Sequence, residues 1–358
     1  MPSRSAAEKW LAELTNLPTA SGHEDAVVDW VQRWVGRRPD LRLVRDSGGN
    51  ILITQKGRKI RHPVVAVAHM DHPAFVAISS DGREVSFEFR GGVNPEYFEA
   101  ARVRFQRADA VGRVRSYDPG EQTGIIEMAK PGLVDEGDIG MWVFRSQRAR
   151  KGRFLAPACD DLAGAAAALA ALDNARGRSG LRHFGVLLTR AEEMGFVGAI
   201  HAAKTATLDK ESRVISIETS RASATAPIGA GPVIRIGDAI TVFDAELTNR
   251  IARAVASQGL IHQRKLMDGG GCEATAFGVF GYRATGLCLA LGNWHNRGNL
   301  DEFEAGTGQP VPKMEEISLD DYHGLIDLLL VAAAAADQPD DLVARFDILY
   351  EETRSVLE

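Results

Sequence analysis

Hydrophobic and polar positions follow two different periods along the chain. Apolar residues at helical spacing over residues 10–14 and 27–35 predict two helices, separated by the helix-breaking run PTASG. Residues 41–46 and 51–57 predict two strands around the turn SGGN. The continuous β-branched run 63–69, PVVAVAH, is typical of a strand buried on both faces of a parallel sheet. The first part of the chain therefore predicts a sheet with helices packed on it.

The pattern changes between about residues 72 and 155, where short strand-like pieces are separated by DG, GG, PG and GD turns. Beyond this stretch, predicted helices at 164–175 and 197–206 alternate again with predicted strands at 183–189 and 213–219. Two C-terminal helices, at 320–336 and 340–352, are expected to cover the sheet. We predict an α/β fold, a doubly wound mixed or mostly parallel sheet flanked by helices. Residues 1–71 and 156–358 would form the catalytic domain, and 72–155 an inserted small β-rich lid or oligomerisation domain.

Composition narrows the class of protein. The formal net charge of -6 argues against nucleic acid or an anionic membrane as the main partner. The three cysteines have no CxxC spacing, so neither a disulfide framework nor a thiolate zinc site is expected. The N-terminus lacks a signal-peptide core, and the apolar run at 331–336 is too short for a membrane span. We expect a soluble enzyme of the cytoplasm.

Side chains that bind metals or move protons lie at the ends of the predicted buried strands or in the loops that follow them. In open α/β sheets, this edge is where ligands bind. A hydrolytic metal pair needs a carboxylate that bridges both ions, terminal ligands for each ion, and a further carboxylate that moves protons. The chain supplies a candidate for every role: His69, Asp71, Asp160, Glu192, Glu193, Glu218 and His295.

Each of these motifs also has a simpler interpretation. HMD can be a turn that ends a strand, and His72 is an alternative ligand, although its side chain should face the other way. Either Asp160 or Asp161 can cap the helix that follows. The paired glutamates can be solvated charge, and Glu218 an exposed strand end. The run DGGGCEATAF at 268–277 can let backbone approach a substrate or be a flexible turn, but no phosphate-loop lysine follows it.

Taken together, the motifs resemble the tetrahedral, dodecameric two-metal aminopeptidases, a family of the co-catalytic zinc metallopeptidases. The resemblance covers nearly the whole chain, because LTNLPTASGHEDAV, HMD, CDDLAG, EEMGFVGA, SIET, DGGGCEA and a late histidine occur in the family's order. The long separation of His69 from Asp160 leaves room for a β-rich domain between the first two ligands, as in this family.

The resemblance implies a metal-dependent aminopeptidase that acts on short peptides. One ion would be held by His69, Asp160 and Glu218, and the other by Asp160, Glu193 and His295. Glu192 would be the general base that activates a water between the ions, and Asp71 would orient His69. The expected cofactors are two divalent ions per chain, Zn²⁺ first, with Co²⁺ and Mn²⁺ as alternatives. The expected partners are a peptide substrate and further copies of the chain, in a homo-oligomer that is a dodecamer in the family.

The sequence departs from the family pattern beside the ligands. The departures are His72-Pro73-Ala74 after HxD, Leu162 in place of an arginine, Glu218 where aspartate is common, His295 in NWHN, and Cys272-Glu273 in place of Thr-Asp. Because every proposed ligand is retained, these changes bear on substrate preference more than on metal binding. The alternatives are a two-metal hydrolase of another amide, such as an acylated amino acid, and a non-catalytic metal-binding scaffold.

Overall fold

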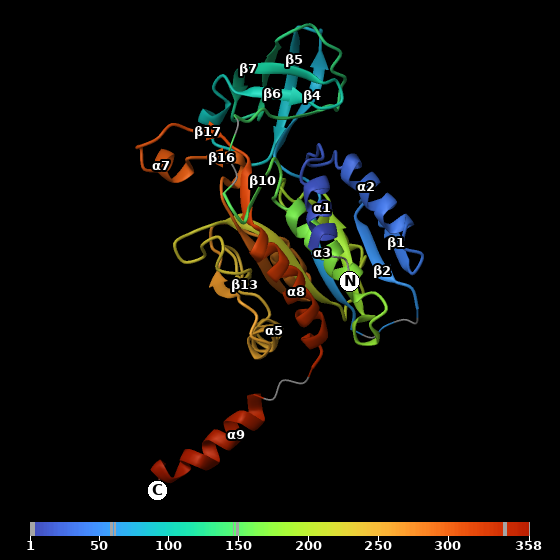
Figure 1. The fold of residues 1–358 in the computed structure, drawn as a ribbon, viewed down its shortest axis with the longest axis vertical. Helices are drawn as coiled ribbons and strands as arrows, with labels where there is room; N and C mark the ends of the chain where they lie inside the picture. The colour runs from blue at the N-terminus through green and yellow to red at the C-terminus, as the bar shows by residue number, and fades with distance from the viewer. Residues whose placement is uncertain are drawn as a thin grey trace.

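The structure is a computed structural model that describes residues 4–57, 60, 62–145, 147, 150–338 and 342–357. An α/β body carries a β-barrel at one end, and a helix projects from the opposite end (Figure 1). Within the described part of the chain, no helix is long and apolar enough to cross a membrane.

An eight-stranded mixed sheet forms the centre of the body. Its inner strands β11, β3, β12 and β15 are parallel to one another, whereas β1, β2 and β13 join the sheet through antiparallel pairs. In order across the sheet, the strands are β1 (Leu41–Arg45), β2 (Ile51–Gln55), β11 (Phe184–Thr189), β3 (Val64–His69), β12 (Arg213–Arg221), β15 (Arg283–Leu291), β13 (Val233–Gly237) and β14 (Gln263–Leu266).

Helices cover both faces of this sheet. Ala66 and Ala68 of β3 pack into the larger core on one face, whereas Val65 and Val67 pack into the smaller core on the other. This two-sided burial explains why β3 is apolar throughout. The larger core includes α1 (Arg4–Leu14), α2 (Asp25–Gly36), α3 (Leu162–Ala175), α5 (Ala245–Ser257) and α8 (Leu319–Ala335), and the smaller core includes α4 (Val197–Lys204) and α6 (Glu273–Val279). The predicted α/β class is confirmed.

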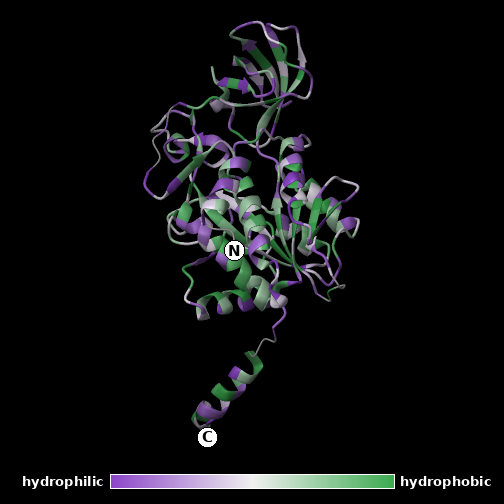
Figure 2. Cartoon of the chain, turned by 45° about the vertical axis from the view of Figure 1, so that its right-hand side comes forward, coloured by the Kyte–Doolittle hydropathy of each residue, from purple (hydrophilic) through white to green (hydrophobic). Residues whose placement is uncertain are grey.

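The inserted β-rich unit is a closed antiparallel barrel that follows directly from the end of β3. Around the barrel, the strands are β4 (Ala74–Ser80), β5 (Glu84–Arg90), β8 (Thr123–Met128), β7 (Ala110–Asp118), β6 (Arg102–Phe105) and β9 (Ile139–Trp142). Residues of β5 alternate between buried and half-buried, while those of β3 are all buried. In Figure 2, hydrophilic and hydrophobic residues are mixed over the barrel at the top of the view. Phe75, Phe89 and Trp142 meet in an aromatic core of its own. The predicted insertion is therefore present, while its exact limits of 72 and 155 stay a prediction.

Several short elements complete the fold. Strand β10 (Arg153–Ala156) pairs with β18 (Glu315–Ser318), and β16 (Arg297–Gly298) with β17 (Val311–Pro312). The other short elements are η1 (Pro95–Phe98), η2 (Ser179–Leu181), η3 (Trp294–Asn296) and α7 (Leu300–Glu304). The Tyr97 hydroxyl donates to the carbonyl of Gly298 at 3.0 Å, which ties the segment after η3 to the barrel.

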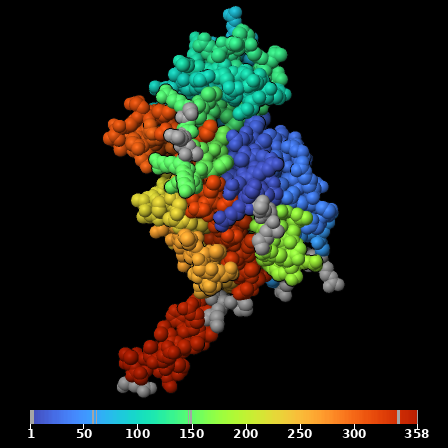
Figure 3. Space-filling model, viewed as in Figure 1, coloured from blue at the N-terminus to red at the C-terminus, as the bar shows by residue number. Residues whose placement is uncertain are grey.

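Of the two predicted C-terminal helices, α8 lies on the sheet and α9 does not. Helix α9 (Leu342–Thr353), followed by η4 (Arg354–Leu357), contains no buried residue and stands away from the body (Figure 3). The expectation that it covers the sheet is therefore wrong, because α8 and its neighbours already fill that face. Residues 340 and 341 of this predicted helix lie outside the described residues.

Candidate active site

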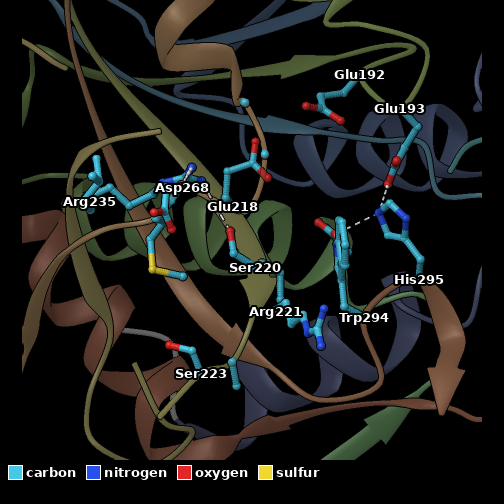
Figure 4. Close-up of a pocket in the computed structure, with 18 of the residues that line it drawn as sticks. Glu192, Glu193, Glu218, Ser220, Arg221, Ser223, Arg235, Asp268, Trp294 and His295 are labelled. Atoms are coloured by element: carbon cyan, nitrogen blue, oxygen red, sulfur yellow. Dashed lines mark hydrogen bonds and ion pairs between the residues drawn. The ribbon is translucent and has the colours of Figure 1, made fainter. Parts of the chain in front are cut away.

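The candidate ligands come from the carboxyl ends of neighbouring parallel strands and the loops beside them. His69 ends β3, Glu218 lies on β12, and Glu192 and Glu193 follow β11. His295 lies in η3, beyond the end of β15. In Figure 4, Glu193 and His295 face each other, with Glu192 and Glu218 around the same cavity. Segments far apart in the sequence therefore meet at one edge of the sheet.

Two groups of potential ligands share Asp160. Ligand atoms of His69, Asp160 and Glu218 all lie within 4.8 Å of one another, and so do those of Asp160, Glu193 and His295. The Asp160 carboxylate lies 3.4 Å from Nε2 of His69 and 3.6 Å from Nε2 of His295. The structure thus brings together all of the predicted ligands, in the two groups that the resemblance implies, while ligation itself stays a prediction.

The chemistry of these groups fits divalent cations. Oε1 of Glu218 is buried and has no hydrogen-bond partner among the described residues. Nδ1 of His69 lies 3.1 Å from the carbonyl of Asp71, and Nδ1 of His295 lies 2.8 Å from the carbonyl of Gly92. These contacts direct both Nε2 atoms toward the carboxylates, as metal-binding histidines require. Buried imidazole and carboxylate donors in this arrangement suit zinc or a neighbouring transition metal.

The carboxylates of the cluster repel one another, and this repulsion shifts their pKa values. Burial and the nearby Glu218 raise the pKa of Glu192 well above its ordinary value, and burial likewise raises the pKa of Glu218. The pKa of Asp160 is lowered, because hydrogen bonds from His295 and His69 outweigh its burial. Against the effect of burial, Glu193 and Asp160 raise the pKa of His295 to about 10. The raised pKa values of Glu192, Glu218 and His295 mean that protons balance the negative charge of the cluster, as bound cations would.

Glu192 lies beside both groups as a further carboxylate. Its Oε2 is 3.9 Å from Nε2 of His69. Ligand atoms of Glu192 also fall within 4.8 Å of His69 and Glu193, so its distance alone is compatible with a ligand as well as with a base. Glu192 does not belong to either group that contains Asp160.

Asp71 connects the end of β3 to the paired glutamates. Its carboxylate lies 3.4 Å from Nδ1 of His69 and accepts hydrogen bonds from the N–H groups of Glu192 at 3.0 Å and Glu193 at 3.1 Å. Ser21 donates to the same carboxylate at 2.6 Å. Asp71 therefore fixes the backbone of both glutamates as well as contacting His69.

Glu315 performs a similar task on the other side of the site. Its buried carboxylate accepts from the N–H groups of Cys159 at 2.6 Å, Asp160 at 3.0 Å and His295 at 2.8 Å. His295 has φ of 55°, a left-handed conformation that side chains other than glycine rarely adopt. The bond from Glu315 holds this strained residue in place. Burial raises the pKa of Glu315 to about 7.

The alternative ligand His72 is engaged elsewhere. Its Nδ1 lies 2.7 Å from the carbonyl of Asp160 and its Nε2 lies 3.1 Å from Oδ1 of Asn296. The Asn296 amide donates to the carbonyls of Pro157 and Lys313, which fixes its oxygen toward His72. Both ring nitrogens are therefore engaged by protein oxygens, and His72 is directed away from the two ligand groups.

Asp161 occupies the N-cap position of α3, but its side chain makes no capping hydrogen bond. It accepts instead from the hydroxyl of Thr219 at 2.6 Å. A Cβ atom at Gly164 would lie 2.3 Å from this carboxylate, so glycine makes room for it. The cap interpretation therefore does not account for either aspartate, whose joining peptide bond is cis.

A cavity of about 620 Å³ opens over the cluster. The glycine-rich run lines it with Gly269, Gly270 and Gly271, in agreement with the interpretation that backbone approaches a substrate there. Arg235 of β13 lines the same cavity (Figure 4) although its side chain is buried. Its guanidinium has only long contacts, at 3.3 Å to the Ser220 hydroxyl and 3.4 Å to the Met267 carbonyl, and Nε has no partner among the described residues.

Sequence reasoning missed three residues that shape this site. Glu24 accepts from Nε of Arg190 at 2.6 Å and from the N–H of Ala191 at 3.1 Å, so it supports the segment before the paired glutamates. The SGHED motif contained it without suggesting this role. In the sequence, Arg235 stands out only as a cation within an apolar strand. Glu315 carries no local signal that separates it from an exposed strand residue.

Comparison with known proteins gives a family model that matches part of the chain, and a shared fold. The model of the M42 glutamyl aminopeptidase family matches residues 127–304. No curated protein sequence matches the chain. The Pyrococcus horikoshii TET1 peptidase, whose subunits form a tetrahedron or a large octahedral shell, is similar with a TM-score of 0.76 and 18% identity over 93% of this chain and 100% of that one.

Two further solved structures share the fold. An aminopeptidase from Desulfurococcus kamchatkensis has a TM-score of 0.73 and 19% identity, and covers 94% of this chain and 96% of its own. An M18-family aminopeptidase from Thermotoga maritima has a TM-score of 0.67 and 16% identity, and covers 92% of this chain and 96% of its own. At these identities the likeness is one of fold.

Proposed function

We propose that the chain is a hydrolase related to the M42 peptidases and, more specifically, a metal-dependent aminopeptidase that removes N-terminal residues from short peptides. The observation that carries this proposal is the pair of ligand groups that share Asp160, with the further carboxylate of Glu192 beside them. A carboxylate common to both groups is what a two-metal site requires.

We assign His69, Asp160 and Glu218 to one divalent ion, and Asp160, Glu193 and His295 to the other, with Zn²⁺ as the first candidate. When bound, the ions would polarise the peptide carbonyl and acidify a water. Glu192 takes a proton from the attacking water and delivers it to the leaving amine. Asp71 holds His69 and the backbone of both glutamates, and Glu315 holds the backbone of Asp160 and His295.

The TET1 peptidase can assemble into a tetrahedron or a large octahedral shell, and we propose that this chain also forms a homo-oligomer, with the barrel as one contact or as a lid over the cavity. We place its activity in the cytoplasm, where its three buried cysteines would remain free thiols. Short peptides are the substrates that suit a cavity of this size.

Metal content measured together with hydrolysis of peptides with free and blocked N-termini tests the proposed function. About two divalent ions per chain are expected, with release of N-terminal residues that stops on chelation and returns when metal is added. Bound metal without hydrolysis of any peptide would favour the scaffold instead. Activity on N-blocked substrates alone would favour a hydrolase of another amide.

We further propose that Arg235 recognises an acidic side chain at the N-terminus of the substrate. The family model that matches part of the chain is that of the M42 glutamyl aminopeptidases. Arg235 is a buried cation whose hydrogen bonds to protein are long and leave Nε without a partner among the described residues. Ser220, its contact, lies on β12 two residues beyond Glu218, so both side chains point to the same face of the strand. A carboxylate would give the guanidinium the bidentate partner it lacks.

Replacing Arg235 by methionine should lower kcat/KM selectively for a substrate with N-terminal glutamate. The expected loss is about 10- to 100-fold, the worth of a hydrogen bond to a charged group, while a matched substrate with N-terminal leucine changes by less than about threefold. Steady-state kinetics on the two substrates measure this, each serving as the control for the other. An equal loss on both would show that Arg235 supports the site without selecting the side chain.

A further inference from the structure

Helix α9 exposes an apolar surface that nothing in the described part of the chain covers. It has no buried residue, and Phe346, Leu349 and Tyr350 are 66%, 52% and 57% exposed. Figures 1 and 3 show it clear of the body. A helix of this length is marginal in water unless it packs against something, and apolar patches of this kind mark interaction surfaces. A partner is therefore required.

The apolar side chains recur at the spacing of a coiled coil. Leu342 and Leu349 are one heptad apart, and so are Val343 and Tyr350, with Phe346 between the two pairs. In heptad notation the leucines occupy d positions, Phe346 an a position, and Val343 and Tyr350 e positions. These residues form one stripe along the helix. The stripe is the kind of surface that another helix covers.

Two charged residues flank this stripe at g positions, namely Arg345 and Glu352. Neither has an ion pair within the described residues, whereas their neighbours Glu351 and Arg354 pair with each other at 2.9 Å. The two charges are opposite in sign and one heptad apart. In two copies of the helix that run in opposite directions, the positive charge of each copy can lie opposite the negative charge of the other.

We propose that α9 pairs in antiparallel orientation with α9 of a second copy of this chain. When Phe346 of one copy packs on Leu349 of the other, Val343 meets Tyr350 and Arg345 meets Glu352, and two-fold symmetry repeats each contact. A parallel pair loses this match, because g positions then face e positions and Arg345 meets Tyr350. Charge complementarity therefore favours α9 of a second copy as the partner and the antiparallel orientation of the pair. The contact is separate from the α/β body and independent of catalysis.

Chemical cross-linking of the full chain tests the pairing whatever other interfaces hold the assembly together. A short bis-maleimide should join Val343→Cys/Tyr350→Cys chains into covalent dimers, while the single-cysteine variants give little product. The native cysteines are buried, so they do not compete. The two introduced thiols are two helical turns apart on one chain, which disfavours bridging within a helix.

Charge reversal in the Val343→Cys/Tyr350→Cys chain distinguishes a second copy of the chain from other partners. Arg345→Glu and Glu352→Arg each replace attraction by repulsion at both symmetric pairs and should lower dimer yield about tenfold. The double reversal Arg345→Glu/Glu352→Arg should return it to within about twofold of the starting level. Peptide hydrolysis should be unchanged in all variants, since these residues lie outside the active site. Absence of cross-linked dimers, or a double variant that stays as weak as the single ones, would overturn the proposal.

Discussion

Replacing Glu192 by glutamine should abolish peptide hydrolysis while leaving both metal ions bound. Glutamine keeps the shape of the side chain but cannot accept a proton, so kcat should fall by about 10³-fold, the usual worth of a general base. The backbone should stay in place, because the N–H of residue 192 still donates to Asp71. Single-turnover kinetics and metal content of the purified variant measure the two effects separately.

Glu193→Gln is the matched control for this prediction. Glu193 is the neighbouring residue and its N–H is held by the same Asp71, but its carboxylate lies 3.2 Å from Nε2 of His295, within a group that contains Asp160. This variant should lose activity together with about one metal equivalent per chain. If Glu192→Gln loses metal to the same extent, Glu192 is a ligand, as its proximity to His69 also allows, and the base must be sought elsewhere.

The sequence predicts the part of this site that depends on buried parallel strands. Strand β3 is apolar throughout because helices cover both of its faces, and that run points directly to His69 at its end. The same argument finds Glu218 on β12 and the paired glutamates after β11. The β-rich character of the insertion is predictable as well, since its turns and alternating residues are local signals, whereas its closure into a barrel is not.

Contacts between distant segments escape such reasoning. Glu315 acts through backbone N–H groups of residues more than a hundred positions away, at Cys159 and Asp160, and such partners have no sequence pattern. Arg235 becomes a candidate only when its strand is seen to border the cavity. For α9, periodicity predicts the helix and its apolar face. It does not predict what that face packs against, because the choice depends on whether the body has an open groove.

The metal-free protein should become more stable when Glu218 is replaced by glutamine. Burial and the nearby negative charges of Asp160 and Asp161 raise the pKa of Glu218 well above its unfolded value, so its ionised form is unfavourable in the folded chain. An acid with a raised folded pKa contributes stability at low pH that is lost as pH rises through that pKa. His69 and His295, whose pKa values are also raised, lose their contributions in the same direction.

In chelator, the free energy of unfolding of the unmodified chain should therefore fall as pH rises from about 5 to 9, and Glu218→Gln should reduce this fall. At pH 8 the variant should be about 1–2 kcal/mol more stable than the unmodified protein, the scale of one buried unfavourable polar group. Denaturant titrations at several pH values measure it. The exposed Glu121→Gln on the barrel is a control that should change nothing.

Added zinc should reverse this order of stability. The unmodified chain gains stability by binding ions to the folded state only, whereas the variant lacks one ligand and should bind at least about 100-fold more weakly at that site. A Glu218→Gln protein that is less stable in chelator, or that zinc stabilises as much as the unmodified chain, would remove Glu218 from the proposed ligands. If both results are found, repulsion among these carboxylates lowers the stability of the metal-free chain, and the same carboxylates are needed to bind the ions.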